Sequence, residues 1–275
     1  MTDLLRADLR RSVKDKLFLV LCIIGGVFAL IIPLLYKGIF MLLGFDQEMI
    51  ELLSEMGLGI NAKSMLFSSF SLGNNFGLML PIFVTIIICK DFSGGTIRNK
   101  IISGKSRASI YFSMLITTAI LVCGFIFAHA ILTMLVSLIF FDYQPTAFTM
   151  SDFGYLMASL GMELLIYFMV SAIITFFIVN MKRAGLSIVM YFVVYFVMTV
   201  VGSIIGAVYM FADPDSAFHG FLEFLNASNA FTTTAIGTGM SYALKDILYL
   251  VLPNAALCAL IVGLGYLTFR KKDIK

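Results

Sequence analysis

The tripeptide Gly104-Lys105-Ser106 has the residues with which a phosphate-binding loop ends, and it lies in the basic stretch "KDFSGGTIRNKIISGKSRASIYFS". A complete P-loop reads G-x-x-x-x-G-K-[ST] and connects a strand to a helix, so that its backbone N–H groups surround a phosphate. The first glycine of that pattern would be residue 99, but this position is Asn99, and a long apolar run precedes the stretch. We therefore expect no nucleotide binding by this chain.

Residue patterns that could support catalysis or metal binding are weak elsewhere in the sequence. The two histidines, His129 and His219, are too few for a metal centre, and the acidic residues near His219 do not have ligand spacing. The four cysteines all fall within apolar runs, without the spacing of a metal site or a disulfide framework. We therefore expect no catalytic residue, no metal and no cofactor in this chain.

His129 and Glu163 are the ionisable groups, other than Cys and Tyr, that interrupt the long apolar runs. A charge inside a membrane is costly, so such residues are usually paired or functional. His129 lies about 18 residues before the turn near residues 144–150, and Glu163 lies about 16 residues after it. On adjacent antiparallel helices these depths match, because each residue rises 1.5 Å. We predict a hydrogen-bonded His129–Glu163 pair in the outer half of the membrane; a contact with substrate, or no contact, are the alternatives.

The composition determines which elements must position these residues. The chain is 60% hydrophobic and 13% charged, with a mean hydropathy of +1.01, which is outside the range of soluble domains. Six runs are long enough to cross a hydrocarbon core, which needs about 20 apolar residues. They do not alternate as barrel strands would. The expected spans are Leu17–Tyr36, Met65–Cys89, Ala108–Phe141, Phe153–Asn180, Ala184–Ala212 and Ile247–Phe269.

The basic residues predict the orientation of these spans. Most of the 19 Lys and Arg lie in the N-terminal segment, in the loops after the second and fourth spans, and at the C-terminus. The intervening loops contain only Lys37, Lys63 and Lys245. The positive-inside rule therefore places both termini in the cytoplasm. We expect an all-α polytopic protein of the cell membrane, with a single transmembrane domain over residues 1–275.

Residues 1–16 have the pattern of an amphipathic helix. One face carries Leu5, Leu9 and Val13, and an adjoining face carries Arg6, Arg10 and Lys14. A basic amphipathic helix directly before a span is expected to lie on the inner membrane surface. It would serve either as a topology anchor or as an elbow helix that also touches a cytoplasmic partner.

Two outer loops and a glycine pair complete the expected organisation. The loop 37–64 contains a short amphipathic pattern over residues 45–57, and the extracellular loop 213–246 should form short helices that dip back into the outer leaflet. Gly202 and Gly206 form a G-x-x-x-G pair, which lets helices approach closely. That close packing could occur within one subunit or in a dimer.

The basic stretch must lie in the cytoplasm between the second and third spans. Its "SGGT" predicts a loop, after which Thr96 could cap a short helix that ends at Gly104. Ile97, Ile101 and Ile102 of this helix would face inward. Arg98 and Lys100 would face water or a partner. Such a helix is either a docking element or an ordinary basic loop.

This stretch resembles the permease subunit of type-2 ABC exporters. The resemblance rests on an acidic residue after a span, then G-T-I-R-N, then a helix that ends in G-x-S-R and I-Y, over about 25 residues. The six spans, the basic N-terminal helix and the long loop before the last span also fit that family. Many members carry Glu where this chain has Asp91 and a Lys where it has Met114, and the expected fold does not depend on these two departures.

The resemblance implies a homodimer or heterodimer of permeases that pairs with a separate cytoplasmic ATPase, and that ATPase would bind the ATP and Mg. Residues 94–107 would be the coupling helix seated on the ATPase, and the exported substrate would be a peptide, such as an antimicrobial peptide, or another amphiphile. The implied coupling residues are Asp91, Gly95, Thr96, Ile97, Arg98, Asn99, Lys100, Gly104, Lys105 and Arg107.

Two other functions remain open on the sequence alone. One is a secondary transporter that uses Glu163 and His129 as a proton relay, and the other is a membrane receptor or immunity protein that binds a peptide without moving it. Dependence on a separate ATPase distinguishes the exporter from both.

Overall fold

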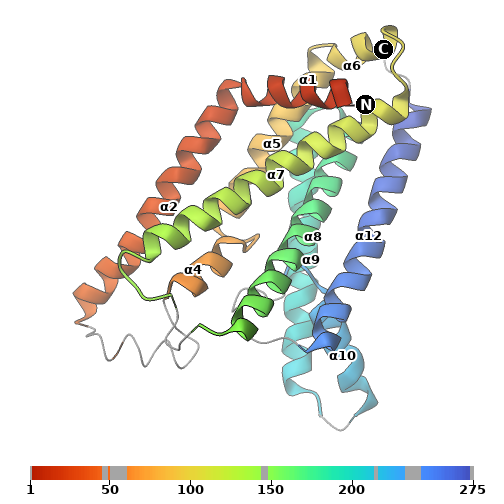
Figure 1. Cartoon of the computed structure of the whole chain (residues 1–275). Coiled ribbons are helices and arrows are strands. Elements are labelled where there is room, and N and C mark those ends of the chain that lie inside the picture. Colours follow the sequence, from red (N-terminus) through yellow and green to blue (C-terminus); the bar gives the residue numbers. More distant parts are fainter. Residues whose placement is uncertain are drawn as a thin grey trace.

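The structure is a computed structural model that describes residues 2–44, 49, 61–143, 148–213, 216–232 and 243–272. Within these residues all regular secondary structure is helical, without strands (Figure 1). The helices are α1 Thr2–Val13, α2 Lys16–Leu43, α4 Ala62–Ser69, α5 Asn75–Ser93, α6 Thr96–Ile102, α7 Arg107–Ser137, α8 Met150–Met181, α9 Ala184–Phe211, α10 Ala217–Ser228 and α12 Leu244–Lys271. The amphipathic pattern predicted over residues 45–57 lies almost wholly outside the described residues.

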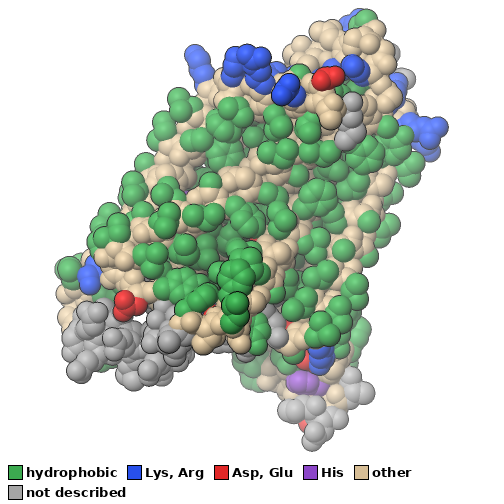
Figure 2. Space-filling view, in the orientation of Figure 1, with side chains coloured by type: hydrophobic (Ala, Val, Ile, Leu, Met, Phe, Trp, Pro, Cys, Tyr) green, Lys and Arg blue, Asp and Glu red, His purple; other side chains and the backbone are tan. Residues whose placement is uncertain are grey.

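Six of these helices are long and apolar enough to cross a membrane, namely α2, α5, α7, α8, α9 and α12. The predicted all-α polytopic membrane fold is therefore confirmed. The start of α1 and the end of α12 lie at the same end of the bundle, near α6, and we call this the basic end (Figure 1). Lys and Arg side chains gather there, over an otherwise apolar flank (Figure 2). The positive-inside rule predicts that the basic end faces the cytoplasm.

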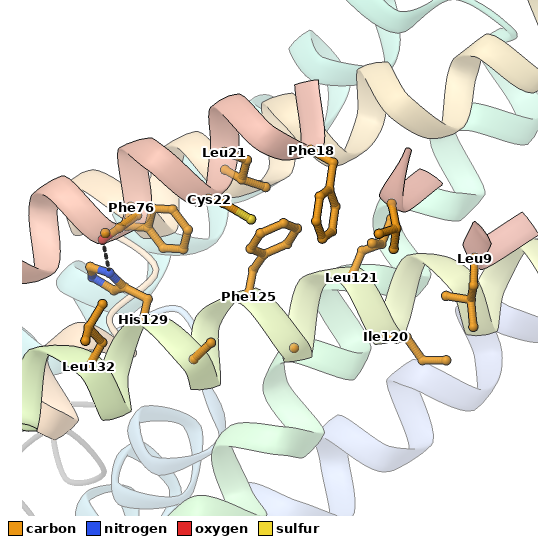
Figure 3. A pocket seen from close by; sticks show the side chains of 15 residues that line it. Leu9, Phe18, Leu21, Cys22, Phe76, Ile120, Leu121, Phe125, His129 and Leu132 are labelled. Atoms are coloured by element: carbon orange, nitrogen blue, oxygen red, sulfur yellow. Dashed lines mark hydrogen bonds between the residues drawn. The ribbon is translucent and has the colours of Figure 1, made fainter. Parts of the chain in front are cut away.

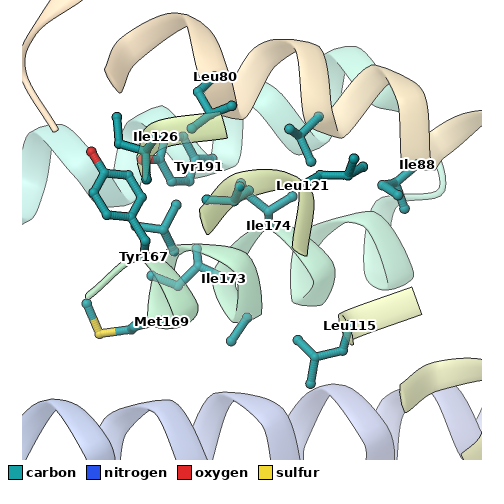
Figure 4. Packing of buried hydrophobic residues seen from close by; sticks show 14 of the residues in the cluster. Leu80, Ile88, Leu115, Leu121, Ile126, Tyr167, Met169, Ile173, Ile174 and Tyr191 are labelled. Atoms are coloured by element: carbon teal, nitrogen blue, oxygen red, sulfur yellow. The ribbon is translucent and has the colours of Figure 1, made fainter. Parts of the chain in front are cut away.

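Helix α8 forms the centre of the bundle and packs against α5, α7, α9 and α12. Side chains from four helices meet along it, among them Leu80, Leu121, Ile174 and Tyr191 (Figure 4). By contrast, α2, α9 and α12 expose rows of large apolar residues, which is how helices that face lipid differ from helices of a soluble core.

The second predicted span, Met65–Cys89, is wrong as a single helix. The chain breaks after Phe70 and separates α4 from α5, because Ser71, Gly73 and Asn74 are poor helix formers. Broken backbone at membrane depth requires partners inside the protein. The Tyr167 hydroxyl of α8 supplies one by donating to the Phe70 carbonyl at 2.7 Å. Helix α4 packs on α7 instead of extending α5.

The glycine pair of α9 packs within the subunit. A Cβ on Gly202 would lie 2.2 Å from the Asn229 amide nitrogen, and one on Gly206 would lie 3.2 Å from the Asn226 side-chain oxygen. Asn226 belongs to α10, and Asn229 follows it and donates to the Met198 carbonyl at 2.9 Å. The G-x-x-x-G spacing therefore brings α9 against α10 and the residues that follow it.

Candidate functional site

Helix α6 forms within the basic stretch as predicted, and glycines set both of its ends. Its N-cap is Gly95, at φ +69°, and Thr96 is the first helical residue, so the predicted cap by the Thr96 side chain is wrong. At the other end Gly104 has φ +80°. Its N–H bonds the Ile101 carbonyl at 3.0 Å while the Lys105 N–H bonds the Lys100 carbonyl at 3.1 Å. This pair of bonds is a Schellman motif, and both glycines favour the left-handed backbone that other residues resist.

The two faces of α6 differ from the predicted assignment at two positions. Ile97 is buried and Ile101 half-buried, as expected, but Ile102 is 73% exposed. Lys100, which was expected to face water or a partner, has a side chain only 11% exposed. Both differences have one cause: α6 is held against the bundle by an ion pair as well as by Ile97. Arg98 and Asn99 are exposed.

Lys100 belongs to a buried ionic cluster at the basic end. Its ammonium lies 2.6 Å from a carboxylate oxygen of Asp8 on α1 and 3.6 Å from Asp91 on α5. Arg11 on α1 pairs with Asp91 and lies 3.6 Å from Asp8. The Ser113 hydroxyl of α7 donates to Asp8 at 2.7 Å. We call Asp8, Arg11, Asp91, Lys100 and Ser113 the four-helix cluster, because they come from α1, α5, α6 and α7.

The four-helix cluster balances its charges. The side chains of Asp8 and Asp91 are 4% and 5% exposed, and two cations face these two carboxylates. A buried charge is tolerated only when it is paired and hydrogen-bonded, and removing one partner is strongly destabilising. The cluster therefore makes α6 move together with α1, α5 and α7 rather than as an independent loop.

A second ion pair lies beside the cluster, where α1 turns into α2. The Lys90 ammonium binds Asp15 at 2.6 Å, and the Asp15 side chain also accepts from the Leu17 N–H at 2.9 Å, which caps α2. Burial alone would raise the pKa of Asp15, but the Lys90 hydrogen bond and the Leu17 N–H outweigh it and lower that pKa below its usual value. This pair joins the α1–α2 corner to the end of α5.

Arg107, one of the implied coupling residues, uses its side chain to bind the end of a membrane helix. Its guanidinium donates to the carbonyls of Arg270 at 2.9 Å and Lys272 at 2.7 Å, at the C-terminal end of α12. Cations stabilise that end of a helix because its last carbonyls lack partners. Lys272 binds the C-terminal end of α8 in the same way, since its ammonium donates to the Val179 carbonyl at 3.1 Å and to the Asn180 carbonyl.

His129 and Glu163 do not form the predicted hydrogen-bonded pair. The His129 ring nitrogen Nδ1 bonds the Gly25 carbonyl of α2 at 3.0 Å, and the ring lies against Phe76 with centroids 4.4 Å apart. Glu163 is buried in α8, and no hydrogen bond or ion pair joins it to another described residue. Helices α2 and α5 pack on α7, and His129 contacts these two helices instead of Glu163 on α8.

The cations and polar groups that α6 leaves in solvent form one exposed surface at the basic end. We call Arg98, Asn99, Ile102 and Lys105 the α6 tip. The described residues contain no group of three or more His, Cys, Asp or Glu that could hold a metal ion. The α6 tip presents two cations, an amide and an isoleucine to solvent on a short helix whose ends are set by glycines.

Asp8, Arg11 and Ser113 are the residues of the site that the sequence did not identify. Asp8 interrupts an otherwise basic helix and shares one face of it with Leu4 and Ser12 at four-residue spacing, and all three are buried. That spacing was visible in the sequence, but the neighbouring stripe of Leu5, Leu9 and Val13 is more apolar and obscured it. The cluster itself joins residues 80 to 105 positions apart, which periodicity cannot detect.

A family model described as "Protein of unknown function (DUF2705)" matches residues 18–275 of this chain. The matched region begins in α2 and includes α6 and all six long helices. No curated protein and no solved structure matches the chain.

Proposed function

We propose that this chain, which belongs to the DUF2705 family, is the transmembrane permease subunit of an ABC exporter in the cell membrane. A separate cytoplasmic ATPase would bind and hydrolyse the ATP, and a second permease chain, of the same or a related kind, would complete the transporter. The exported substrate would be a peptide or another amphiphile, as the resemblance of the basic stretch to that transporter class implies.

The observation that supports the proposal is that α6 exposes one surface to solvent and is joined to the membrane helices by buried ion pairs. A coupling helix must present a surface to the ATPase and must also transmit movement to the membrane helices. The α6 tip meets the first requirement, since Arg98 and Ile102 point into solvent beyond the bundle. The four-helix cluster meets the second, because Lys100 fastens α6 to Asp8 of α1 and lies 3.6 Å from Asp91 of α5. An ordinary basic loop needs neither feature.

Movement of α6 would reach the membrane through these contacts. Helix α1 continues through the Asp15 corner into α2, and Asp91 lies in the last turn of α5. A partner that pushes α6 therefore displaces the basic ends of α2, α5 and α7 together, because separating the buried charges would cost several kcal/mol. Rigid-body rocking of packed helices is a common form of such transitions.

The proton-relay alternative has less support. A relay needs two titratable groups within hydrogen-bonding reach, yet His129 bonds the Gly25 carbonyl and no hydrogen bond joins it to Glu163. The receptor or immunity alternative predicts a chain that functions without an ATPase.

Co-purification tests the proposal. The tagged chain is solubilised in detergent together with a candidate ABC ATPase from the same organism, and wild type is compared with Arg98→Glu/Lys105→Glu at the α6 tip. The matched control is Arg270→Glu/Lys271→Glu, which reverses two exposed charges at the same end of the bundle, on α12. We expect ATPase recovery to fall at least tenfold in the α6 variant alone. Failure of wild type to retain the ATPase, or equal loss in both variants, would contradict the proposal.

A further inference from the structure

An apolar groove opens along the side of the bundle between α2 and α7, with α1 across its basic end (Figure 3). Its volume is about 410 Å³, within the range of roughly 300–1,000 Å³ typical of small-molecule sites. Almost all of its lining is apolar. The residues that shape it include Leu9, Val13, Phe18, Phe125, Ile120 and Leu132.

Glycines give the groove its depth. Gly25, Gly26 and Gly124 line it, and a Cβ on Gly26 or Gly124 would meet nothing within 4 Å. The groove is therefore space that larger side chains could occupy without disturbing the packing. The polar group within it is His129, whose Nδ1 already bonds the Gly25 carbonyl. Such a groove suits a flexible hydrocarbon chain better than a polar ligand.

Free cations lie on α1, which closes the groove, and directly after its last residue. Arg6, Arg10 and Lys14 are exposed, and their side chains make no ion pair or hydrogen bond within the described part of the chain. They repeat every four residues, about 6 Å apart along α1. Their neighbours on α1, Leu9 and Val13, are the residues that enter the groove.

A second, polar hollow follows this row of cations. It is lined by Asp3, Arg6, Ala7, Arg10, Arg11, Lys14 and Asp15. Asp15 is neutralised by Lys90, and Arg11 is engaged by Asp91, so the remaining charge of the hollow is three cations against the single carboxylate of Asp3. An anion placed there meets a net positive surface.

We propose that the groove and the cation row form one binding site for an anionic phospholipid of the leaflet at the basic end. The phosphate would lie against Arg6, Arg10 and Lys14, and one acyl chain would enter the groove beneath Leu9 and Val13. The linings of the two hollows alternate along the chain, since Leu9 and Val13 of the groove directly precede Arg10 and Lys14 of the polar hollow, just before α2 begins its apolar run. A soluble partner would not fill a groove that opens on the membrane flank. This proposal does not depend on the exporter function.

The absence of tryptophan from the sequence gives a direct assay. Ile120→Trp places a unique fluorophore at the rim of the groove, where Ile120 is 45% exposed. The protein is reconstituted in phosphatidylcholine vesicles with increasing phosphatidylglycerol, and one of the two lipids carries bromine on its acyl chains to quench the tryptophan on contact. Leu260→Trp on α12, where Leu260 is 62% exposed, is the control for ordinary lipid contact.

At each tryptophan the assay gives a preference for phosphatidylglycerol over phosphatidylcholine. We expect this preference to be at least about tenfold greater at Ile120→Trp than at Leu260→Trp. The reason is that each cation near an anionic lipid contributes about fivefold to the binding of that lipid. The triple substitution Arg6→Gln/Arg10→Gln/Lys14→Gln should abolish that difference. Arg6→Lys/Arg10→Lys should retain it, which separates charge from damage to α1.

A further pair of variants tests the groove itself. Gly124→Leu in the Ile120→Trp background should reduce quenching by both brominated lipids, because the leucine fills the groove. Gly161→Leu, at an exposed glycine of α8 with equally open surroundings, should not. Equal lipid preference at the two tryptophans, a preference that survives the triple substitution, or quenching unchanged by Gly124→Leu would each overturn the proposal.

Discussion

Replacing Lys100 by methionine tests whether the four-helix cluster holds α6 to the bundle. The substitution keeps most of the apolar stem of the side chain and removes the ammonium that lies 2.6 Å from Asp8 and 3.6 Å from Asp91. Both carboxylates stay buried, and Arg11 is left as the single cation beside them. The variant therefore carries one uncompensated negative charge in a region that water barely reaches.

The expected cost follows from that geometry. Removing one partner of a buried ion pair typically costs about 3–5 kcal/mol. Asp8 keeps its hydrogen bond from Ser113 and Asp91 keeps Arg11, so we place the loss of stability near the lower limit, at about 3 kcal/mol. For a chain of this size, each kcal/mol corresponds to roughly 2–4 °C in Tm. Lys100→Met should therefore lower Tm by about 6 °C or more.

Thermal unfolding in detergent micelles measures this effect, and Arg98→Met is the matched control. Arg98 lies two positions earlier on the same helix but is exposed, so its loss should change the stability by less than about 0.5 kcal/mol. The double variant Asp8→Asn/Lys100→Met should cost less than the sum of its two single changes, because the neutral amide no longer needs the cation. Equal Tm values for Lys100→Met and Arg98→Met would refute the cluster as a structural link.

Two further predictions concern the membrane interior. Tyr167→Phe removes the hydroxyl that bonds the Phe70 carbonyl at the break between α4 and α5, and it should cost about 1–3 kcal/mol in the same unfolding assay because the buried carbonyl loses its partner. Gly202→Ala places a methyl group 2.2 Å from the Asn229 amide and should cost about 1–3 kcal/mol through overpacking, whereas Gly263→Ala, in open surroundings on α12, should be neutral or slightly stabilising.

Each of these has an outcome that would contradict it. Tyr266→Phe removes a hydroxyl with no hydrogen bond to another described residue, so an equal effect of the two tyrosine changes would show that the bond to Phe70 does not support the break. If Gly202→Ala melts at the same temperature as Gly263→Ala, then α9 and the residues after α10 do not pack as closely as the structure places them.

Hydropathy predicted most of the fold because lipid-facing helices must be apolar over their whole length. The boundaries of α7, α8 and α9 lie within four residues of the predicted spans. The hydropathy prediction was wrong at the second span, because an average over about 20 residues hides a short interruption such as Ser71-Leu72-Gly73-Asn74. The structure also starts α4 earlier than the predicted span, at a capping box formed by Asn61 and Ser64.

The site was harder to predict, because its charges are paired across the fold. The basic stretch was correctly assigned to a short helix with Gly104 at its end, since that depends on local backbone preference. The prediction that Lys100 is exposed was wrong, because its partner Asp8 lies 92 residues away on α1 and could not be identified from local spacing. On α1 the helix was expected, but the face that packs on the protein carries Asp8 and Ser12, while Leu9 and Val13 line the groove.

Contact between the α6 tip and an ATPase is the central claim, and site-specific photo-crosslinking tests it most directly. A benzophenone amino acid is placed at Ile102, which is 73% exposed at the α6 tip, and in a second protein at Met150, which is 85% exposed at the start of α8. Irradiation of membranes that also contain the candidate ABC ATPase should give an ATPase adduct from position 102 and none from position 150. The absence of an ATPase adduct from position 102, in membranes where transport is active, would contradict the proposed function.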